Sequence, residues 1–396
     1  MNNAIVVVHP QGAVKNIGDY VQTIAIKQYY TNATEFIDRE KLHSYKSADN
    51  SKTNVIVNGC YVWNTGNWPP SDDLNPLFIS MHIFPMAEKA LFSEANVAYW
   101  KKHEPIGCRD LSTLKMFQRH HIDSYYSSCV TLTLGEKYKF YGKRQGVYFV
   151  DPYIPLPLFK DGASFRMLVW SELLQTLLFY RKHRSIINKL AKHEFFGLYG
   201  PNWGHSHYKG IKQYLMRHYH ALQFYRIYSQ TFTDELMLSA EYVTHMYRLK
   251  KDKQETDDDL CNIADNLIKK YAHAEFVITS RIHSALPCLG VETPVIFCLN
   301  DDMESSKIKF NTPGRFDGII DFFRILRISK DGVQTEDKEL LKLAKISSMS
   351  NFHNKDNYKK YAEKLKGSIQ KFISCSNSRG GEVNSSNSYT ACRMAA

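Results

Sequence analysis

The segment EFVITSRIHSALPCLGVETPVIFCL, residues 275–299, carries the pattern that decides the fold. Two short apolar runs, Glu275–Thr279 and Pro294–Leu299, have the length and composition of buried strands. Between them, a turn at Ser280 and Arg281 leads into a short helix. Strand, helix and strand at this spacing predict a βαβ unit, whose crossover is almost always right-handed. We therefore expect parallel strands covered by helices.

The same alternation of strands and helices occupies the first third of the chain. Helices are predicted from Asp19 and from near Asp110. Another is predicted to start at Thr256, because the three aspartates that follow can interact with the free backbone amides of a first helical turn. Strands are predicted at Ile5–His9, Asn54–Asn58, Leu77–Ile83, Pro105–Arg109 and Tyr125–Leu134. This order indicates an α/β fold with a mostly parallel sheet.

The chain is long enough for two domains, and its character changes along its length. We predict one Rossmann-like domain over residues 1–145 and a second over 146–373. The second contains an insertion at about 164–247 that is rich in basic and aromatic residues and is predicted to be mainly helical. Residues 374–396 are rich in Ser, Asn and Gly, and we predict a disordered tail there.

Composition and charge narrow the class of protein without choosing a function. Hydrophobic residues make up 43% and charged residues 23%, which is typical of a soluble globular protein. The net charge of +11 suits nucleic acid, anionic lipid or a small polyanionic substrate. The N-terminus lacks the features of a secretory signal, and the apolar stretch Met167–Tyr180 is too short to span a bilayer. The eight cysteines form no Cys-x-x-Cys pair, so we expect reduced thiols and a cytoplasmic protein, either free or peripheral at a membrane.

Cationic residues follow two of the predicted strands. Arg281 and His283 lie just after one strand, and Arg109 lies at the equivalent place in the first half. Ligands of open α/β sheets bind beyond the carboxyl ends of the strands, where helix amides favour anions. These residues could therefore hold a small polyanion. The alternatives are a surface arginine with a core or capping histidine, and an exposed ion pair of little energetic value.

A third motif, Asn16-Ile17-Gly18-Asp19, lies between the first predicted strand and helix. Gly18 permits a close approach of the backbone, and Asp19 could accept hydrogen bonds from a hydroxyl or act as a base. The simpler interpretation of Asp19 is a helix N-cap.

Metal and nucleic-acid sites are less well supported. The alternate histidines of His205-Ser206-His207 and His218-Tyr219-His220 have no obvious carboxylate or thiolate partner, and we predict no metal site. The basic, aromatic stretch 165–230 could bind nucleic acid or a membrane surface, or it could simply be an ordinary solvated helical face. Because no recognition motif accompanies the charge, we expect no nucleic-acid partner and favour the membrane interpretation.

Three segments resemble motifs of the polysaccharide pyruvyl transferases, in the order in which that family carries them. They are the Asn-x-Gly-Asp segment at residues 16–19, the segments 107–113 and 127–134 around Arg109, and the Arg-x-His segment at 277–284 followed by 293–296. The resemblance implies two Rossmann-like domains that face a cleft, as in GT-B glycosyltransferases. It also implies phosphoenolpyruvate as the donor, with no further cofactor. The acceptor would be a sugar of capsular or exopolysaccharide biosynthesis, often lipid-linked.

The resemblance also suggests roles for individual residues. Arg109 and Arg281 would clamp the donor, His283 would donate a proton or bind phosphate, and Asp19 would orient a hydroxyl or act as base. Further donor residues would be Ser280, Ser284 and one of Lys307, Lys309 and Arg315, and acceptor residues would be Asn16, Gly18, Asn58 and His82. The competing hypothesis is a GT-B glycosyltransferase that uses a nucleotide sugar.

Overall fold

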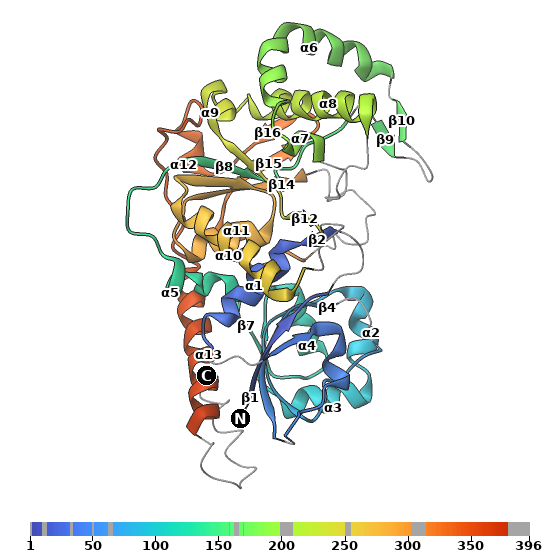
Figure 1. Cartoon of the computed structure of the whole chain (residues 1–396), viewed down its shortest axis with the longest axis vertical. Coiled ribbons are helices and arrows are strands. Elements are labelled where there is room, and N and C mark those ends of the chain that lie inside the picture. Colours follow the sequence, from blue (N-terminus) through green and yellow to red (C-terminus); the bar gives the residue numbers. More distant parts are fainter. Residues whose placement is uncertain are drawn as a thin grey trace.

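The computed structural model describes residues 2–9, 14–31, 35–49, 51–61, 66–157, 159–161, 166–168, 170–198, 209–249, 255–301 and 314–378. Its described part is a mixed α/β structure with two six-stranded sheets that lie one above the other along the long axis (Figure 1). Parallel strands with helical connections in both sheets are consistent with a Rossmann-like architecture. Among these residues, no helix has both the length and the apolar character needed to cross a bilayer.

The first sheet has the order β3-β1-β4-β5-β6-β7, and its pairings are parallel. Its strands are β1 (Asn2–Val7), β3 (Glu35–Asp38), β4 (Thr53–Tyr61), β5 (Leu74–Ile83), β6 (Ile106–Cys108) and β7 (Ser124–Tyr126). The helices of this half are α1 (Ile17–Lys27), α2 (Glu88–Leu91), α3 (Glu94–Lys102), α4 (Leu111–Arg119) and α5 (Gly135–Tyr138). The predicted strands near residues 5, 54, 77 and 105 and the helices near 19 and 110 are confirmed.

The second sheet has the order β11-β8-β13-β14-β15-β16, and only its β15–β16 pairing is antiparallel among the described strands. Its strands are β8 (Val147–Val150), β11 (Glu241–Val243), β13 (Phe276–Thr279), β14 (Val295–Asn300), β15 (Arg324–Ser329) and β16 (Gly332–Gln334). Helices α10 (Asp257–His273) and α11 (Ile282–Gly290) precede and follow β13. The βαβ unit predicted at 275–299 is therefore confirmed, as is the helix start at Thr256, which forms a capping box with Asp259.

The insertion is mainly helical where the structure describes it. Strand β10 (Arg166–Leu168), which pairs with β9 (Phe159–Asp161) just before the insertion, is followed by α6 (Trp170–Leu190), α7 (Phe195–Leu198), α8 (Gly210–Tyr228) and α9 (Asp234–Ser239). The last residues of the insertion are not helical, because β11 joins the second sheet and β12 (Met246–Arg248) pairs with β2 (Val14–Asn16).

Two other predictions need correction. The run Tyr125–Leu134 is a strand only through Tyr126, and residues Val130–Leu134 form a 3₁₀ helix. Its alternation of Val, Leu and Thr imitates a strand, but the threonines are buried as fully as the apolar residues because the turn lies in the core. In the predicted disordered tail, residues 374–378 are helical, because α13 (Lys359–Ser378) packs Leu365 and Ile369 into the core and continues past them. Residues 379–396 lie outside the described part.

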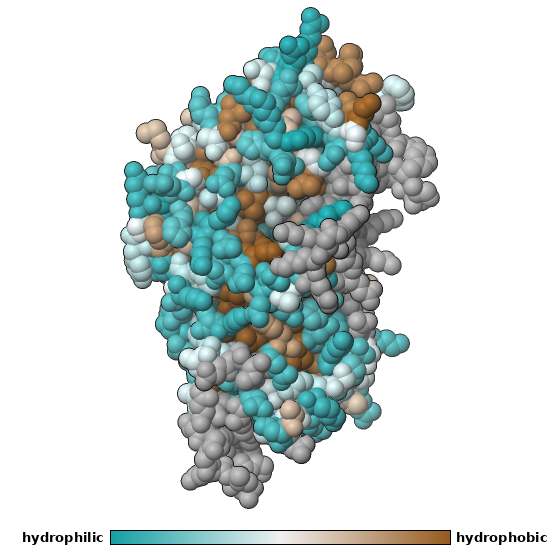
Figure 2. All heavy atoms as spheres, in the orientation of Figure 1, coloured by the Kyte–Doolittle hydropathy of each residue, from teal (hydrophilic) through white to brown (hydrophobic). Residues whose placement is uncertain are grey.

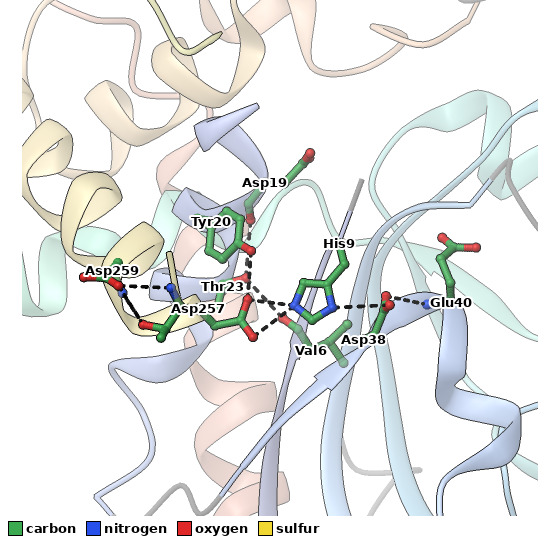
Figure 3. Close-up of polar contacts among 10 residues, drawn as sticks. Val6, His9, Asp19, Tyr20, Thr23, Asp38, Glu40, Asp257 and Asp259 are labelled. Atoms are coloured by element: carbon green, nitrogen blue, oxygen red, sulfur yellow. Dashed lines mark hydrogen bonds and ion pairs between the residues drawn. The ribbon is translucent and has the colours of Figure 1, made fainter. Parts of the chain in front are cut away.

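Helix α12 (Lys338–Leu341) completes the described helices of the second half. One hydrophobic core includes side chains of both halves, with α1 packed against α10 and α11. Polar contacts add to this seam, as Figure 3 shows: the imidazole of His9 lies 2.8 Å from Asp257 and 3.4 Å from Asp38, and the Tyr20 hydroxyl donates to Asp257 at 2.8 Å. The start of α1 is therefore held by elements of both sheets.

Candidate active site

Arg109 follows β6 and carries the most unusual side chain of the first sheet. The residue is fully buried, and none of its guanidinium nitrogens has a hydrogen-bond acceptor among the described residues. The nearest carboxylate oxygen, Oδ2 of Asp110, lies 3.6 Å from Nε. Asp110 instead caps α4 by accepting from the amide of Thr113 at 2.9 Å. Because burying an unpaired charge is costly, this guanidinium is suited to receive an anion.

His82, at the end of β5, forms a dyad with Asp110. Nδ1 of the imidazole lies 2.6 Å from Oδ2 of Asp110, while Nε2 is buried without a partner among the described residues. Burial and the charge of Arg109 lower the pKa of His82 to about 4, against the opposing effect of Asp110. At neutral pH the imidazole is therefore uncharged. Its proton is placed on Nδ1 by the carboxylate, so that Nε2 can accept a proton.

Arg281 follows β13 in the second sheet and has a buried acidic partner. Its Nε donates to Oδ2 of Asp151 at 2.9 Å, and the same oxygen accepts from the amide of His245 at 2.9 Å. The hydroxyl of Ser280 accepts from the amide of Tyr153 at 2.9 Å. Ser280 thus has a structural contact with the loop after β8.

His283 lies in the first turn of α11. Arg281 is the N-cap residue of this helix and its side chain makes no capping bond, so the first turn has no side-chain cap. The imidazole of His283 is buried, with Nδ1 3.5 Å from Nε2 of Gln22 and with Nε2 unpartnered among the described residues. Burial, with the charges of Arg109 and Arg315, holds the pKa of His283 well below its usual value. Ser284, next in the helix, is fully buried beside Tyr271.

The Asn16–Asp19 motif forms the start of α1, beside His283. Asn16, rather than Asp19, is the N-cap, and its side chain accepts from the amide of Gly18 at 3.2 Å. A Cβ at Gly18 would lie 3.0 Å from the Cβ of His283 and 3.1 Å from Nδ1 of His245. The close approach predicted at this glycine is therefore confirmed.

The side chain of Asp19 points away from the His9 network (Figure 3), and its carboxylate interacts electrostatically with four arginines. Burial raises the pKa of its carboxyl, whereas the charges of Arg39, Arg315, Arg281 and Arg109 act to lower it. Arg39 and Arg109 follow strands of the first sheet and Arg281 follows a strand of the second, so cations from both halves act on the same carboxylate. The same charges reach Cys60 at the end of β4, where burial raises the pKa of the thiol and Arg109, Arg39 and Arg315 oppose the shift.

The structure thus brings together six of the thirteen predicted site residues. The residues that share these electrostatic contacts are Asp19, His82, Arg109, Arg281, His283 and Arg315. Arg315 lies at the start of the described stretch 314–378, with its guanidinium 5.7 Å from the ring of Phe316. Lys307 and Lys309 lie outside the described residues. Asn58 is buried in β4, and no contact among the described residues joins it to this cluster.

Four residues near the cluster were absent from the sequence analysis: Arg39, Cys60, Asp151 and His245. Asp151 and Cys60 follow or end buried strands, so the rule that singled out Arg109 and Arg281 could have found them. Arg39 directly follows β3, but the sequence analysis predicted no strand there, and His245 carries no such signal. His245 reaches the site because the residues on either side of it pair with β8 and with β2, which belong to distant parts of the chain.

The described residues contain no group of three or more His, Cys, Asp or Glu side chains arranged to hold a metal ion. His205 and His207 lie outside the described part. The helix α8 carries His218 and His220, whose Nδ1 atoms contact different carbonyl oxygens, those of Tyr214 at 2.9 Å and Phe196 at 2.8 Å.

Arginines, uncharged imidazoles and an uncapped helix start at the strand ends of two sheets define an α/β protein suited to a small anionic substrate. Comparison with known proteins supports a specific family: the model described as polysaccharide pyruvyl transferase matches residues 16–302, and the chain belongs to that family. Neither the curated proteins nor the solved structures gave a match.

Proposed function

We propose that this protein transfers the pyruvyl unit of phosphoenolpyruvate to two hydroxyls of a sugar and forms a pyruvate ketal. The observation that carries the proposal is the fully buried guanidinium of Arg109, which has no hydrogen-bond acceptor among the described residues. Phosphoenolpyruvate carries a carboxylate and a phosphate, close to three negative charges at neutral pH. Arginine can bind both groups with paired hydrogen bonds, so several arginines at one site suit this donor.

In this proposal, Arg109, Arg281 and Arg315 neutralise the donor, and the uncapped start of α11 supplies amides to its phosphate. His283 interacts with the charges of Arg109 and Arg315, and because its pKa is well below the usual value its imidazole is uncharged at neutral pH. A bound phosphate would offset the cations and raise the pKa of His283, so the imidazole can gain a proton as the donor binds. His283 would then give that proton to C3 of phosphoenolpyruvate.

Two hydroxyl protons must be lost when the ketal forms. C3 gains one proton and becomes a methyl group, C2 bonds to the first hydroxyl oxygen, the bond from C2 to phosphate breaks, and the second hydroxyl closes the ring. One hydroxyl proton balances the proton gained at C3, and the other leaves with inorganic phosphate. We assign Nε2 of His82 as the base that accepts a hydroxyl proton, with Asp110 stabilising the imidazolium and Asp19 orienting the sugar.

The acceptor is proposed to be a sugar of a surface polysaccharide, such as a capsular or exopolysaccharide repeat, linked to a lipid and reached from the cytoplasm. The family supports a polysaccharide acceptor. The donor site would lie in a GT-B-like cleft between the predicted domains 1–145 and 146–373, since the cations come from the strand ends of both sheets.

The test is thermal unfolding with and without millimolar phosphoenolpyruvate, in the wild type and in Arg109→Met. A ligand at about one hundred times its dissociation constant adds about 2.7 kcal/mol, which for a chain of this size raises Tm by about 3 °C. We expect that rise in the wild type and none in the variant. Lys115→Met, a change in α4 six residues from Arg109, serves as the control and should keep the response.

The competing hypothesis of a nucleotide-sugar glycosyltransferase predicts a different ligand. If a uridine diphosphate sugar stabilises the wild type and phosphoenolpyruvate does not, the proposed donor is wrong.

A further inference from the structure

Helices α6 and α8 lie together at one end of the molecule, beyond the second sheet (Figure 1). Their inner faces are fixed to the protein, because Ile187, Leu190, Leu222 and Phe224 belong to the core on that side of the sheet. A smaller cluster of Leu173 with Met216 and Tyr219 joins the two helices. The pair is therefore a packed part of the fold whose outer surface is held in a defined orientation.

That outer surface is apolar at the first turns of both helices. On α6, the exposed fractions of Trp170, Leu174, Leu177 and Leu178 are 74%, 65%, 56% and 59%. Their spacing of four, seven and eight residues places them along one stripe of a helix. On α8, the corresponding residues are Ile211, Tyr214 and Leu215, with exposed fractions of 81%, 61% and 59%.

We call these seven side chains the α6/α8 face. Figure 2 shows brown, hydrophobic side chains gathered at this end of the molecule among teal, hydrophilic ones. Large exposed apolar residues elsewhere in the described chain, such as Met86, Tyr141 and Met349, come from separate elements. Isolated exposed apolar residues are ordinary on protein surfaces, whereas a contiguous group of them marks an interaction surface. The α6/α8 face is therefore expected to bind a partner.

The charge around this face selects the kind of partner. Residues 170–198 and 209–228 contain nine Lys or Arg and only two acidic residues, Glu172 and Glu194. The exposed basic residues are Arg181, Lys182, Arg184, Lys189, Lys192, Lys209 and Lys212. Lysine is depleted in protein interfaces, and two copies of this basic face would repel each other. Basic residues that border exposed Trp and Leu instead match the surface of an anionic bilayer.

We infer that the α6/α8 face docks on an anionic membrane surface, with its apolar side chains among the acyl chains and its basic residues at the headgroups. Each Lys or Arg near such a surface is attracted to the anionic headgroups, and burial of the apolar side chains adds to the binding. This inference rests on the proposed function in one respect only: docking would place the enzyme at the membrane that carries a lipid-linked acceptor. Docking itself requires neither donor nor acceptor.

The experiment is flotation of the purified full chain with vesicles of phosphatidylcholine alone or with about one third phosphatidylglycerol. We expect the wild type to bind the anionic vesicles at least about tenfold better than the neutral ones, and less well as salt is raised. The double variant L174E/L178E should lose at least about tenfold of that binding. The control L341E/M349E changes two exposed apolar residues elsewhere on the chain, with exposed fractions of 62% and 91%, and should bind as the wild type does.

Three results would overturn the inference: a wild type that does not float with anionic vesicles, an L174E/L178E variant that still does, or a control that loses binding equally. Size-exclusion chromatography without vesicles is the second readout. If L174E/L178E dissociates an oligomer and leaves vesicle binding unchanged, the face is a contact between copies of the chain. Stabilisation of the same variant by phosphoenolpyruvate reports its folding and tests the proposed function separately.

Discussion

Arg109 and Arg281 each follow a parallel strand and precede a helix, one in each sheet, but their side chains are held differently. Arg281 is paired with Asp151 at 2.9 Å, whereas Arg109 is fully buried and lacks an acceptor among the described residues. The helices that follow the two arginines, α4 and α11, also differ in whether a side chain caps their first turn. Asp110 caps the helix beside Arg109, and the helix beside Arg281 has no side-chain cap. One half therefore offers a buried cation without a hydrogen-bond acceptor among the described residues, and the other offers a helix start without a side-chain cap.

The difference separates residues that serve stability from residues that wait for a ligand. Removing one partner of a buried ion pair strongly destabilises a protein, because the other charge stays buried without its partner. A buried charge without a hydrogen-bond acceptor costs free energy until a ligand of opposite charge binds to it. We therefore expect substitution of the two arginines to have opposite effects on the free energy of unfolding. Both should weaken binding of the donor.

The largest effect is expected from Arg109→Met. Loss of the buried cation should lower kcat/KM for ketal formation by about 10³-fold, equivalent to about 4 kcal/mol. The free energy of unfolding should stay the same or rise, because a buried guanidinium without a hydrogen-bond acceptor among the described residues is replaced by an apolar side chain of similar length. Activity assays and urea denaturation test the two parts. A variant that is both inactive and strongly destabilised would contradict the view of Arg109 as a ligand-binding residue.

The next effect is expected from Arg281→Met. This substitution leaves the carboxylate of Asp151 buried with only the amide of His245 as its described partner, and should cost about 3 kcal/mol of stability. The double variant that also carries Asp151→Asn should recover part of the loss in urea denaturation. If Arg281→Met is as stable as the wild type, the two arginines do not differ as the contacts indicate.

A smaller effect is expected from His82→Gln, which tests the dyad beside Arg109. The glutamine retains a polar side chain but cannot take up a proton, so kcat should fall about 10²-fold with little change in KM for phosphoenolpyruvate. His218→Gln, a histidine of α8 that contacts only a carbonyl oxygen among its described hydrogen bonds, is the control and should keep full activity. An unchanged kcat in His82→Gln would remove His82 from the mechanism.

The smallest effect is the change in the free energy of unfolding with pH that is due to two buried histidines, His82 in the first half and His245 in the second. Burial lowers the pKa of both His82 and His245 to about 4, whereas an unfolded histidine titrates near 6.5. Between these values the unfolded chain binds more protons, so stability is fully present above about pH 6.5 and falls as the pH drops toward 4. Each imidazole should contribute about 1 kcal/mol per pH unit to the decline.

Urea denaturation at several pH values between 4.5 and 7 would measure this slope, and His245→Gln should make it shallower. His9 has the opposite sign: hydrogen bonding to Asp38 and Asp257 raises its pKa, so its contribution is lost only as the pH rises above 6.5. A slope that His245→Gln leaves unchanged would mean that the pKa of His245 is the same in the folded and unfolded chain.

Local patterns were sufficient to predict most elements near the site. The strands around 277 and 295 and the helix start at Thr256 follow from apolar run length and capping, which act within a few residues. The same local evidence misled at 130–134, where alternating Val, Thr and Leu form a 3₁₀ turn. Alternation indicates a strand only when one face is exposed, and both faces of this segment are buried.

The sequence by itself determined that cations follow strands in both halves and that Asn16-Ile17-Gly18-Asp19 opens a helix, because such features depend on neighbours along the chain. Only the tertiary structure decided that Arg281 donates a hydrogen bond to a carboxylate and that Arg109 has no acceptor among the described residues, since Asp151 lies 130 residues from Arg281. It also brought His245 against Gly18, through strands that pair with β8 and β2. Whether a charge is compensated depends on burial and on side chains that reach it from distant segments, and neither quantity is encoded in local spacing.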